Sequence, residues 1–407
     1  MVLVEANSLR LGLFDSVSNY SSQSVDYNVS SLAIAFNWIV AVQHFNERRG
    51  DLLAVLGEAS LLSCKKNLSI AAYCDDGGYT ARTMYNMLDY RSEIDVVVGM
   101  PLDTVALSAI IDAQSMGIPV ISHAAPSSLL SNQYQYPMFL RTGPSDDMAA
   151  LNIANLTAQL GLGAVALVYL STEQAFSDSF VTALQSLNIA CSSFAYLQDD
   201  LPSMTLALQG IAGLELNVVV FHGFADDIID LLPSAAKTYG FLNPDKMFIF
   251  TAFDRPLTSD EIAANEMLAQ VMRGALRISP EIPTSQNQTF GKYLRLWESF
   301  NQYSSLANSY FPPSGYQNDS WGCRNSNLTS MTVSDNFLSD SLENPLPSWA
   351  WAYDSIIALV SREKSLLVQT PFQVRLICVS CAGRGNVFRF NIQHSYRKRF
   401  VWSLDAG

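Results

Sequence analysis

The chain has 407 residues, a formal net charge of −13 and a charged fraction of 15%, against about 25% in an average soluble domain. Its length and its hydrophobic fraction of 49% allow two or three folded domains and argue against general disorder. The acidic balance repels phosphate backbones and anionic lipid headgroups, so we expect no nucleic-acid partner. No apolar run reaches the roughly 18 residues of a membrane span, because Gly, Pro, Asn and Gln residues interrupt the two least charged stretches, 113–140 and 148–172.

Short β-branched runs alternate with amphipathic stretches along the chain. They predict strands at 9–14, 68–73, 94–99, 119–122, 164–169, 189–194, 217–222, 247–251 and 274–278. Helices are expected among them at 32–46, 105–116, 148–160, 178–187 and 225–239. A βα repeat forms parallel sheets, and this number of strands without eightfold regularity favours two doubly wound α/β lobes.

The composition shifts after Phe290. Residues 303–348 are rich in Ser, Asn and Pro and predict a long irregular excursion that contains Cys323. A helix is expected at 348–362, followed by a closing hairpin of strands 386–392 and 399–404.

Cysteine and histidine show no spacing typical of a metal site. We therefore expect no metal and no cofactor, and we interpret the cysteines as structural or paired. The CxxC spacing of Cys378 and Cys381 occurs too late in the chain for a thioredoxin-like redox motif. The six cysteines are residues 64, 74, 191, 323, 378 and 381, and the four histidines are residues 44, 123, 222 and 394.

Two features bear on the cellular compartment. Seven Asn-X-Ser/Thr sequons, a modest excess over chance, favour a secreted protein. The first residues show neither a basic nor an apolar signal-peptide region, so the chain is either cytosolic or a fragment without its signal peptide. The sequons begin at Asn19, Asn28, Asn67, Asn155, Asn287, Asn318 and Asn327.

No catalytic or nucleotide-binding motif fits the predicted elements. Residues 161–166 match GxGxxA, but they precede a strand instead of following one, so we interpret them as a helix C-cap. The GxSxG, GxxxxGK[ST] and HExxH patterns do not occur. We therefore expect that the protein is not an enzyme.

Five loops follow predicted strands and begin helices, at 99–104, 122–128, 171–176, 222–223 and 251–254. Open α/β sheets bind ligands at such strand ends, where helix N-termini present backbone N–H groups. We expect these loops to face one cleft. An equally good interpretation is that Asp103, Thr104 and Ser127 only cap helices.

The sequences Ile94-Asp-Val-Val-Val-Gly99, Ile118-Pro-Val-Ile-Ser-His-Ala-Ala-Pro-Ser-Ser-Leu-Leu-Ser131 and Tyr136-Pro-Met-Phe-Leu-Arg-Thr-Gly-Pro-Ser-Asp146 resemble the receptor family ligand-binding region. Weaker matches at 32–46, 350–355 and 383–390 extend the resemblance over nearly the whole chain. The family has the type I periplasmic-binding-protein-like fold. It includes domains of class C G-protein-coupled receptors and receptor guanylate cyclases, and bacterial amino-acid-binding proteins.

The resemblance implies two lobes joined by a three-strand hinge, with a cleft that closes on ligand. Lobe 1 would hold residues 1–142 plus 279–383, and lobe 2 would hold residues 143–278 plus 384–407.

The resemblance also implies lobe 1 residues that contact the ligand. In amino-acid-binding members, Ser and Thr hydroxyls at two pairs of positions hold the α-carboxylate of the ligand. In this chain, the first pair of positions holds Asp103 and Thr104, and the second pair holds Ala124 and Pro126. Asp103 would repel a ligand carboxylate, and Pro126 has no N–H donor. The other lobe 1 candidates are Ala125 and Ser127.

In lobe 2, the resemblance places Asp146 where an acid faces the ligand amine. Phe176 replaces the usual Tyr, Asp254 lies at or one place beyond another acidic position, and His222 ends a strand. Acids from both lobes favour a cationic or amine ligand, such as an amino-acid derivative. The alternative for Asp146 is that it only caps the helix at 148–160.

Family members carry a lobe 1 disulfide near the second strand. Cys64 and Cys74 flank that strand here, but six extended residues span about 20 Å, whereas bonded Cα atoms lie within about 7 Å. A direct bond would require residues 60–67 to fold back.

We therefore expect an extracellular ligand-binding domain of a membrane receptor, at the outer side of the plasma membrane, without the membrane and signalling parts. A homo- or heterodimer through lobe 1 is expected, because family members often pair there and a low surface charge suits a covered face. The alternative of the same fold is a free solute-binding protein of a transporter. The alternative of another class is an α/β enzyme that uses the same cleft.

Overall fold

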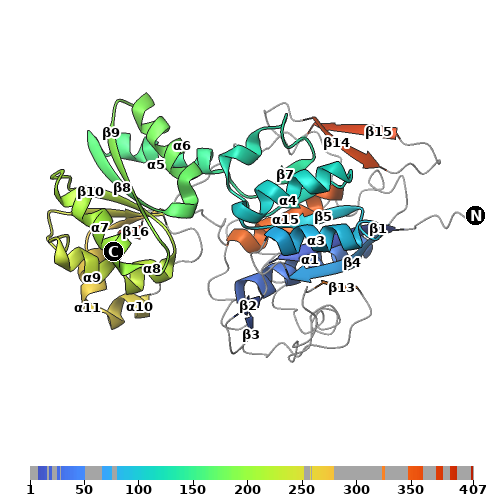
Figure 1. The fold of residues 1–407 in the computed structure, drawn as a ribbon, viewed down its shortest axis with the longest axis horizontal. Coiled ribbons are helices and arrows are strands. Elements are labelled where there is room, and N and C mark those ends of the chain that lie inside the picture. The colour runs from blue at the N-terminus through green and yellow to red at the C-terminus, as the bar shows by residue number, and fades with distance from the viewer. Residues whose placement is uncertain are drawn as a thin grey trace, which may run out of the picture. The chain divides into compact units, whose positions relative to one another are not determined.

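The computed structural model contains two compact units, whose elements are labelled in Figure 1. It describes residues 8–15, 18–20, 25–27, 29–50, 67–75, 80–251, 257, 259–278, 323–325, 347–360, 373–378, 386–391 and 405–406. Unit 1 comprises Met1–Pro126, Leu130–Pro144 and Ile282–Arg399, and unit 2 comprises Ser127–Leu129, Ser145–Glu281 and Phe400–Gly407. The lobes expected from the sequence differ from these units mainly in residues 384–399, which group with unit 1. The lobe boundaries therefore stay a prediction.

Unit 1 is built on a six-stranded sheet in the order β13-β4-β1-β5-β6-β7. Its strands are β1 (Ser8–Asp15), β4 (Asn67–Asp75), β5 (Val96–Gly99), β6 (Val120–Ser122), β7 (Phe139–Arg141) and β13 (Cys323–Asn325). All are parallel except β13, which pairs antiparallel with β4 at the edge. In chain order the parallel strands run 2-1-3-4-5, an order typical of doubly wound sheets.

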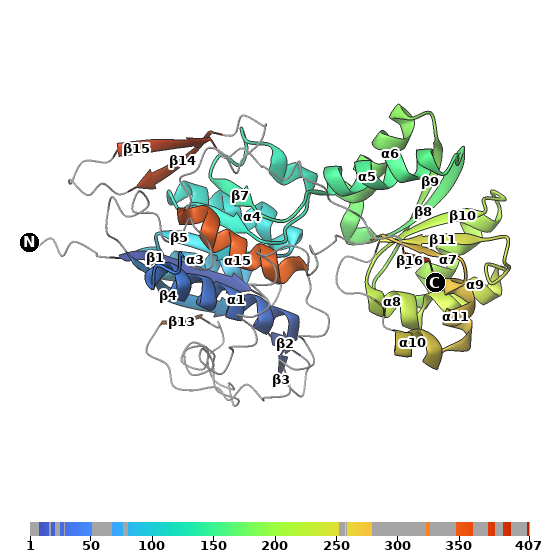
Figure 2. The ribbon, with the colours of Figure 1, turned by 180° about the vertical axis from the view of Figure 1, so that it is seen from behind.

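Helices cover both faces of this sheet (Figures 1 and 2). On one face lie α3 (Thr80–Tyr90) and α4 (Asp103–Ser115), and on the other lie α1 (Val29–Asn46) and α15 (Pro347–Val360). The first face is filled by apolar side chains of β1, β5, β6 and β7 packed against α3 and α4. On the second face Trp38 Nε1 donates a hydrogen bond to Ser355 Oγ at 3.2 Å, which ties α1 to a helix more than 300 residues away in the chain.

Unit 2 repeats the same plan with the sheet order β16-β12-β11-β10-β8-β9. Its strands are β8 (Ala164–Leu170), β9 (Ala190–Tyr196), β10 (Val218–His222), β11 (Met247–Phe250), β12 (Leu276–Arg277) and β16 (Asp405–Ala406). The strands β8 to β12 again run 2-1-3-4-5 and are parallel, and β16 pairs antiparallel with β12 at the edge. Its helices are α5 (Asp146–Gln159), α6 (Gln174–Ser186), α7 (Leu201–Ala212), α8 (Ala225–Asp230), α9 (Leu232–Thr238), α10 (Ser259–Ala264) and α11 (Glu266–Met272).

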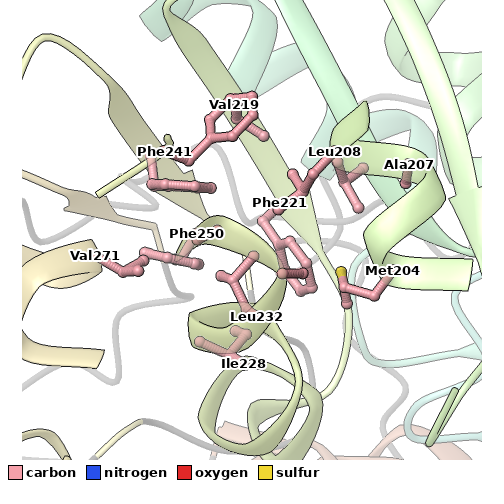
Figure 3. Close-up of a cluster of buried hydrophobic side chains, with 14 of the residues drawn as sticks. Met204, Ala207, Leu208, Val219, Phe221, Ile228, Leu232, Phe241, Phe250 and Val271 are labelled. Atoms are coloured by element: carbon pink, nitrogen blue, oxygen red, sulfur yellow. The ribbon is translucent and has the colours of Figure 1, made fainter. Parts of the chain in front are cut away.

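Alternate side chains of the unit 2 strands enter two different cores. In β8, Leu167 packs towards α5 and α6, whereas Val168 packs towards the face covered by α7, α8, α9 and α11. Figure 3 shows the second core, where Phe221 and Phe250 of the sheet meet Met204 of α7 and Leu232 of α9. A strand buried on both faces has no position for a charge, which explains the uncharged runs of the sequence.

One sequence prediction about the elements is wrong. The helix expected at 225–239 is two helices, α8 and α9, because Pro233 in the first turn of α9 has no N–H to continue the hydrogen bonds of α8. The strand β15 (Asn386–Asn391) pairs antiparallel with β14 (Gln373–Cys378), a strand that the sequence did not predict. The expected partner of β15, residues 399–404, lies outside the described residues.

The remaining elements are short. The strands β2 (Ser18–Tyr20) and β3 (Val25–Tyr27) pair antiparallel, and two 3-10 helices span Ser128–Ser131 and Ser171–Glu173. The excursion predicted at 303–348 is described only at β13 and at the start of α15. Within the described ranges, no helix is long and apolar enough to cross a membrane.

Candidate functional site

The unit 1 sheet has its topological switch point between β1 and β5, where doubly wound sheets bind ligands. Asp15, a buried acid that the sequence did not single out, ends β1 at this point. Gly99 ends β5 with a φ of 131°, and a Cβ there would lie 1.7 Å from the carbonyl oxygen of Phe14. Only glycine lets the chain turn so close to β1, so this residue fixes the path into α4.

Asp103 is the first residue of α4 and is half-buried. The N-cap position belongs to Leu102, which makes no side-chain cap bond, so the interpretation of Asp103 as the N-cap is wrong. Its carboxylate lies in the first turn, where the helix dipole stabilises negative charge. Thr104 is exposed, and its carbonyl oxygen accepts a hydrogen bond from Thr80 Oγ1 at 3.1 Å.

The loop after β6 is shaped by Ser122, which the sequence did not identify as a functional candidate. Its Oγ donates to Met100 O at 3.1 Å and accepts from the backbone N–H groups of Ala124 at 3.2 Å and Ala125 at 2.9 Å. Ala125 is buried and Ala124 is half-buried. Their methyl groups present no side-chain hydrogen-bond donor to a ligand.

Arg141 holds the same loop from β7. Its Nη1 donates to the carbonyl oxygens of Ala125 at 3.2 Å and Pro126 at 2.9 Å, and its guanidinium also contacts Ser131. Ser127 is buried, and its Oγ accepts from Leu129 N at 3.3 Å, which places this hydroxyl in a local turn. Arg141 is therefore a positioning residue, and it lies within the stretch 136–146 that carries the family resemblance.

His123 lies beside this loop and is fully buried. Its ring meets Trp38 edge to face at a centroid distance of 5.3 Å, and neither ring nitrogen has a hydrogen-bond partner within the described part of the chain. Burial lowers the pKa of His123 to about 3, so the ring is neutral near pH 7. A Cβ at Gly143 would lie 2.5 Å from His123 O, so the segment after β7 passes directly over this residue.

In unit 2 the corresponding switch point lies between β8 and β10. His222 ends β10, and its ring stacks on that of Phe176 of α6 with centroids 3.6 Å apart and planes 7° apart. Both side chains are buried, so they form a packed pair at the strand ends. The structure thus brings together two candidates chosen on different grounds, Phe176 from the resemblance and His222 from its place at a strand end.

A threonine hydroxyl contacts the His222 ring. Thr251 Oγ1 lies 2.8 Å from His222 Nδ1 and 3.0 Å from the carbonyl oxygen of Phe221, so it links the ring to the neighbouring strand. Burial lowers the pKa of His222 to about 3, against the opposing effect of Thr251, so at neutral pH this ring adds no positive charge.

Asp146 is the first residue of α5 and only 3% exposed. The N-cap position belongs to Ser145, so the alternative that Asp146 is the cap residue is wrong. The following Asp147 accepts a hydrogen bond from Ser179 Oγ at 2.7 Å, which links α5 to α6. Asp254 lies outside the described residues.

The candidates divide between the carboxyl edges of the two sheets. Unit 1 carries Asp103, Thr104, Ala124 and Ala125, and unit 2 carries Asp146, Phe176 and His222, together with the short segment that begins at Ser127. Unit 1 offers Asp103 in the first turn of α4, unit 2 offers Asp146 and Asp147 in the first turn of α5, and the unit 2 edge adds a neutral histidine.

Comparison with known proteins agrees with this geometry. The sequence model described as "Receptor family ligand binding region" matches residues 39–362. No curated protein sequence matches the chain.

Two solved structures share the fold. A leucine-binding protein from Thermotoga maritima superposes with a TM-score of 0.57 at 12% identity, over 86% of this chain and 81% of that one. An ABC transporter substrate-binding protein from Desulfitobacterium hafniense, solved with leucine, gives a TM-score of 0.52 at 15% identity, over 87% and 83%. The two parallel α/β units and the extent of the family match show that the chain belongs to the receptor family ligand-binding region, whose members bind ligands on a type I periplasmic-binding-protein fold.

Proposed function

We propose that this protein is a non-catalytic binding protein that holds a small molecule at the carboxyl-edge loops of both sheets and closes on it. The observation that carries the proposal is the repeated sheet order, which gives each unit a switch point lined by candidate binding residues. A ligand that contacts both units only in the closed state would shift the population towards that state.

The ligand that we propose carries a cationic nitrogen, as an amine or an amino-acid derivative does. Asp103 and Asp146 each open a helix at a carboxyl edge, and His222 is neutral near pH 7. Ala124 and Pro126 stand at positions where the family resemblance expects hydroxyl donors, so a carboxylate on the ligand would find fewer partners here. The leucine-bound neighbour supports an amino-acid-like size.

The setting that the solved neighbours favour is a free solute-binding protein of a transporter, which acts outside the cytoplasm. The second candidate is the extracellular domain of a membrane receptor, favoured by the family description and by the seven sequons. The coding sequence that flanks this region of the parent gene separates the two. Membrane spans followed by a signalling domain would support the receptor, and a transporter operon would support the solute-binding protein.

A ligand screen tests the proposal. Thermal unfolding should be followed with single amino acids and amines at millimolar concentration, and hits should be titrated by calorimetry. A bound amine should raise the Tm, and Asp103→Asn and Asp146→Asn should each weaken its binding about tenfold or more.

Asp230→Asn is the matched control, because it removes the same charge from an exposed position of α8. It should leave the affinity unchanged. If no compound in the screen shifts the Tm, the proposal of a small-molecule binder fails. If a ligand binds equally well to all three variants, the assignment of the two acids fails.

A further inference from the structure

Cys74 and Cys323 occupy opposite register positions at the edge of the unit 1 sheet. The strand β13 runs antiparallel to β4, with Cys323 opposite Cys74, Arg324 opposite Tyr73 and Asn325 opposite Ala72. Directly opposite residues in an antiparallel pair have Cα atoms about 4.5–5.5 Å apart and lie on the same face of the sheet. A disulfide requires Cα atoms about 4.4–6.8 Å apart. The register therefore meets the backbone requirement of a disulfide without any shift of the strands.

We propose that Cys74 and Cys323 form a disulfide bond that fastens β13 to β4. The family resemblance suggested a bond between Cys64 and Cys74. That bond would require the chain before β4 to fold back. The pairing with Cys323 needs only the strand register that the fold already has. The closing reaction joins the two sulfur atoms and transfers two electrons and two protons to an external disulfide, which is cleaved to two thiols.

The bond would covalently link the two parts of unit 1 that precede and follow unit 2 in the chain. Unit 1 is assembled from chain segments on both sides of Ser145–Glu281, and Cys74 and Cys323 lie in different segments. The closed loop spans 249 residues (323 − 74). Cross-links across long loops remove the most entropy from the unfolded chain in the loop-closure model, so this bond suits a discontinuous unit. The bond also requires an oxidising compartment. This prediction about the compartment does not depend on which ligand the protein binds.

Peptide mapping tests the bond in the full chain secreted to a bacterial periplasm, which is oxidising and adds no glycan to Asn67 or Asn318. The protein is alkylated without reduction and digested with trypsin, which cuts after Lys66, Arg82, Arg295 and Arg324. We expect peptides 67–82 and 296–324 to appear as one linked species that is lost on reduction. Alkylated Cys74 and Cys323, or a link from Cys74 to another cysteine, would overturn the proposal.

A cleavage experiment tests the topology of the same bond. A specific protease site is inserted after Leu214, in the exposed turn between α7 and β10 and thus between the two cysteines. After cleavage, the wild-type chain should run as one band on a denaturing gel and as two bands after reduction. The Cys74→Ser variant should give two bands without reduction.

The matched control is Cys191→Ser, which removes the half-buried thiol of β9 in unit 2. Its cleaved chain should stay joined until it is reduced. Separation of the cleaved wild-type fragments without reduction would contradict the bond. Because neither experiment uses a ligand, their failure would leave the proposed binding function standing.

Discussion

Two buried histidines make this protein sensitive to acid. His123 and His222 have pKa values near 3 in the folded chain, because burial disfavours their charged forms. An unfolded histidine titrates near pH 6.5. The stability that each neutral ring contributes is therefore complete above pH 6.5 and is lost as the pH falls towards 3, because only the unfolded chain takes up the proton in this window.

For His123 we predict that replacement by leucine changes the pH dependence of stability. Between pH 7.5 and pH 4.5 the free energy of unfolding of His123→Leu should fall by about 2.5 kcal/mol less than that of the wild type. Urea unfolding at both pH values measures this difference. Trp38→Phe, which alters the ring packed against His123 without adding or removing a titrating group, should cost the same at both values. An equal effect of His123→Leu at both values would contradict the assignment of a buried neutral ring.

Individual binding residues were harder to predict than their location. The alternative that Asp103 and Asp146 are N-cap residues was wrong by one position. The N-cap of α4 is Leu102, and the N-cap of α5 is Ser145. Ser122 and Arg141 shape the loop after β6 through contacts with backbone atoms of other segments. Both residues lie in the stretches 118–131 and 136–146 that carry the family resemblance. Their contacts depend on how the strands are arranged in the sheet, so the motif alone did not indicate them.

At the scale of elements, α7 has a glycine in its last turn and another at its C-cap, and we expect opposite responses of the two to alanine. In a helix interior, Gly→Ala normally stabilises by about 0.5–1 kcal/mol. At Gly210, however, the new Cβ would lie 2.4 Å from a ring carbon of Phe194, which packs against the unit 2 core. At Gly213, the C-cap, the nearest atoms are 3.6 Å away and φ is −67°.

We therefore predict that Gly210→Ala lowers the free energy of unfolding by about 1–2 kcal/mol, a magnitude typical of overpacking. The control Gly213→Ala should leave it unchanged or raise it by a few tenths of a kcal/mol. The double variant Gly210→Ala with Phe194→Ala should have the same free energy of unfolding as Phe194→Ala alone, or a slightly higher one. Chemical denaturation measures all three, and a stabilising Gly210→Ala would show that Phe194 does not pack over this glycine.

The alternation of strands and helices was predictable because parallel strands buried on both faces leave short uncharged runs, such as Val96–Gly99. The partners at the sheet edges were not predictable in this way. The strand β13 joins β4 from a segment about 250 residues later in the chain, and β15 pairs with β14, which the sequence did not predict as a strand. Which distant strands pair depends on the whole folded chain, so the local hydrophobic periodicity of a strand does not indicate its partner.

At the scale of the whole molecule, the low charge leaves apolar side chains on the outer helices of unit 1. Tyr85 and Leu88 of α3 are 49% and 48% exposed, and Ile111 of the neighbouring α4 is 46% exposed. The dimer through lobe 1 that the sequence predicts would use these exposed side chains as its contact.

We predict that the unglycosylated chain self-associates and that Leu88→Lys with Ile111→Lys yields a monomer in light scattering after gel filtration. The control Leu206→Lys changes a side chain of α7 in unit 2 that is 68% exposed, and it should leave the association unchanged. A wild-type chain that is monomeric at tens of micromolar would contradict the proposed dimer.

Hydrogen–deuterium exchange with the best ligand of the screen tests most directly the claim that a small molecule is held at the carboxyl edges of both sheets. We expect slower exchange at residues 100–104 and 122–128 of the first edge and at 171–176 and 222–224 of the second. The turns at the amino ends of the strands, 116–118, 160–163, 187–189 and 213–217, should exchange at unchanged rates. Protection confined to those turns, or to one sheet alone, would contradict the account.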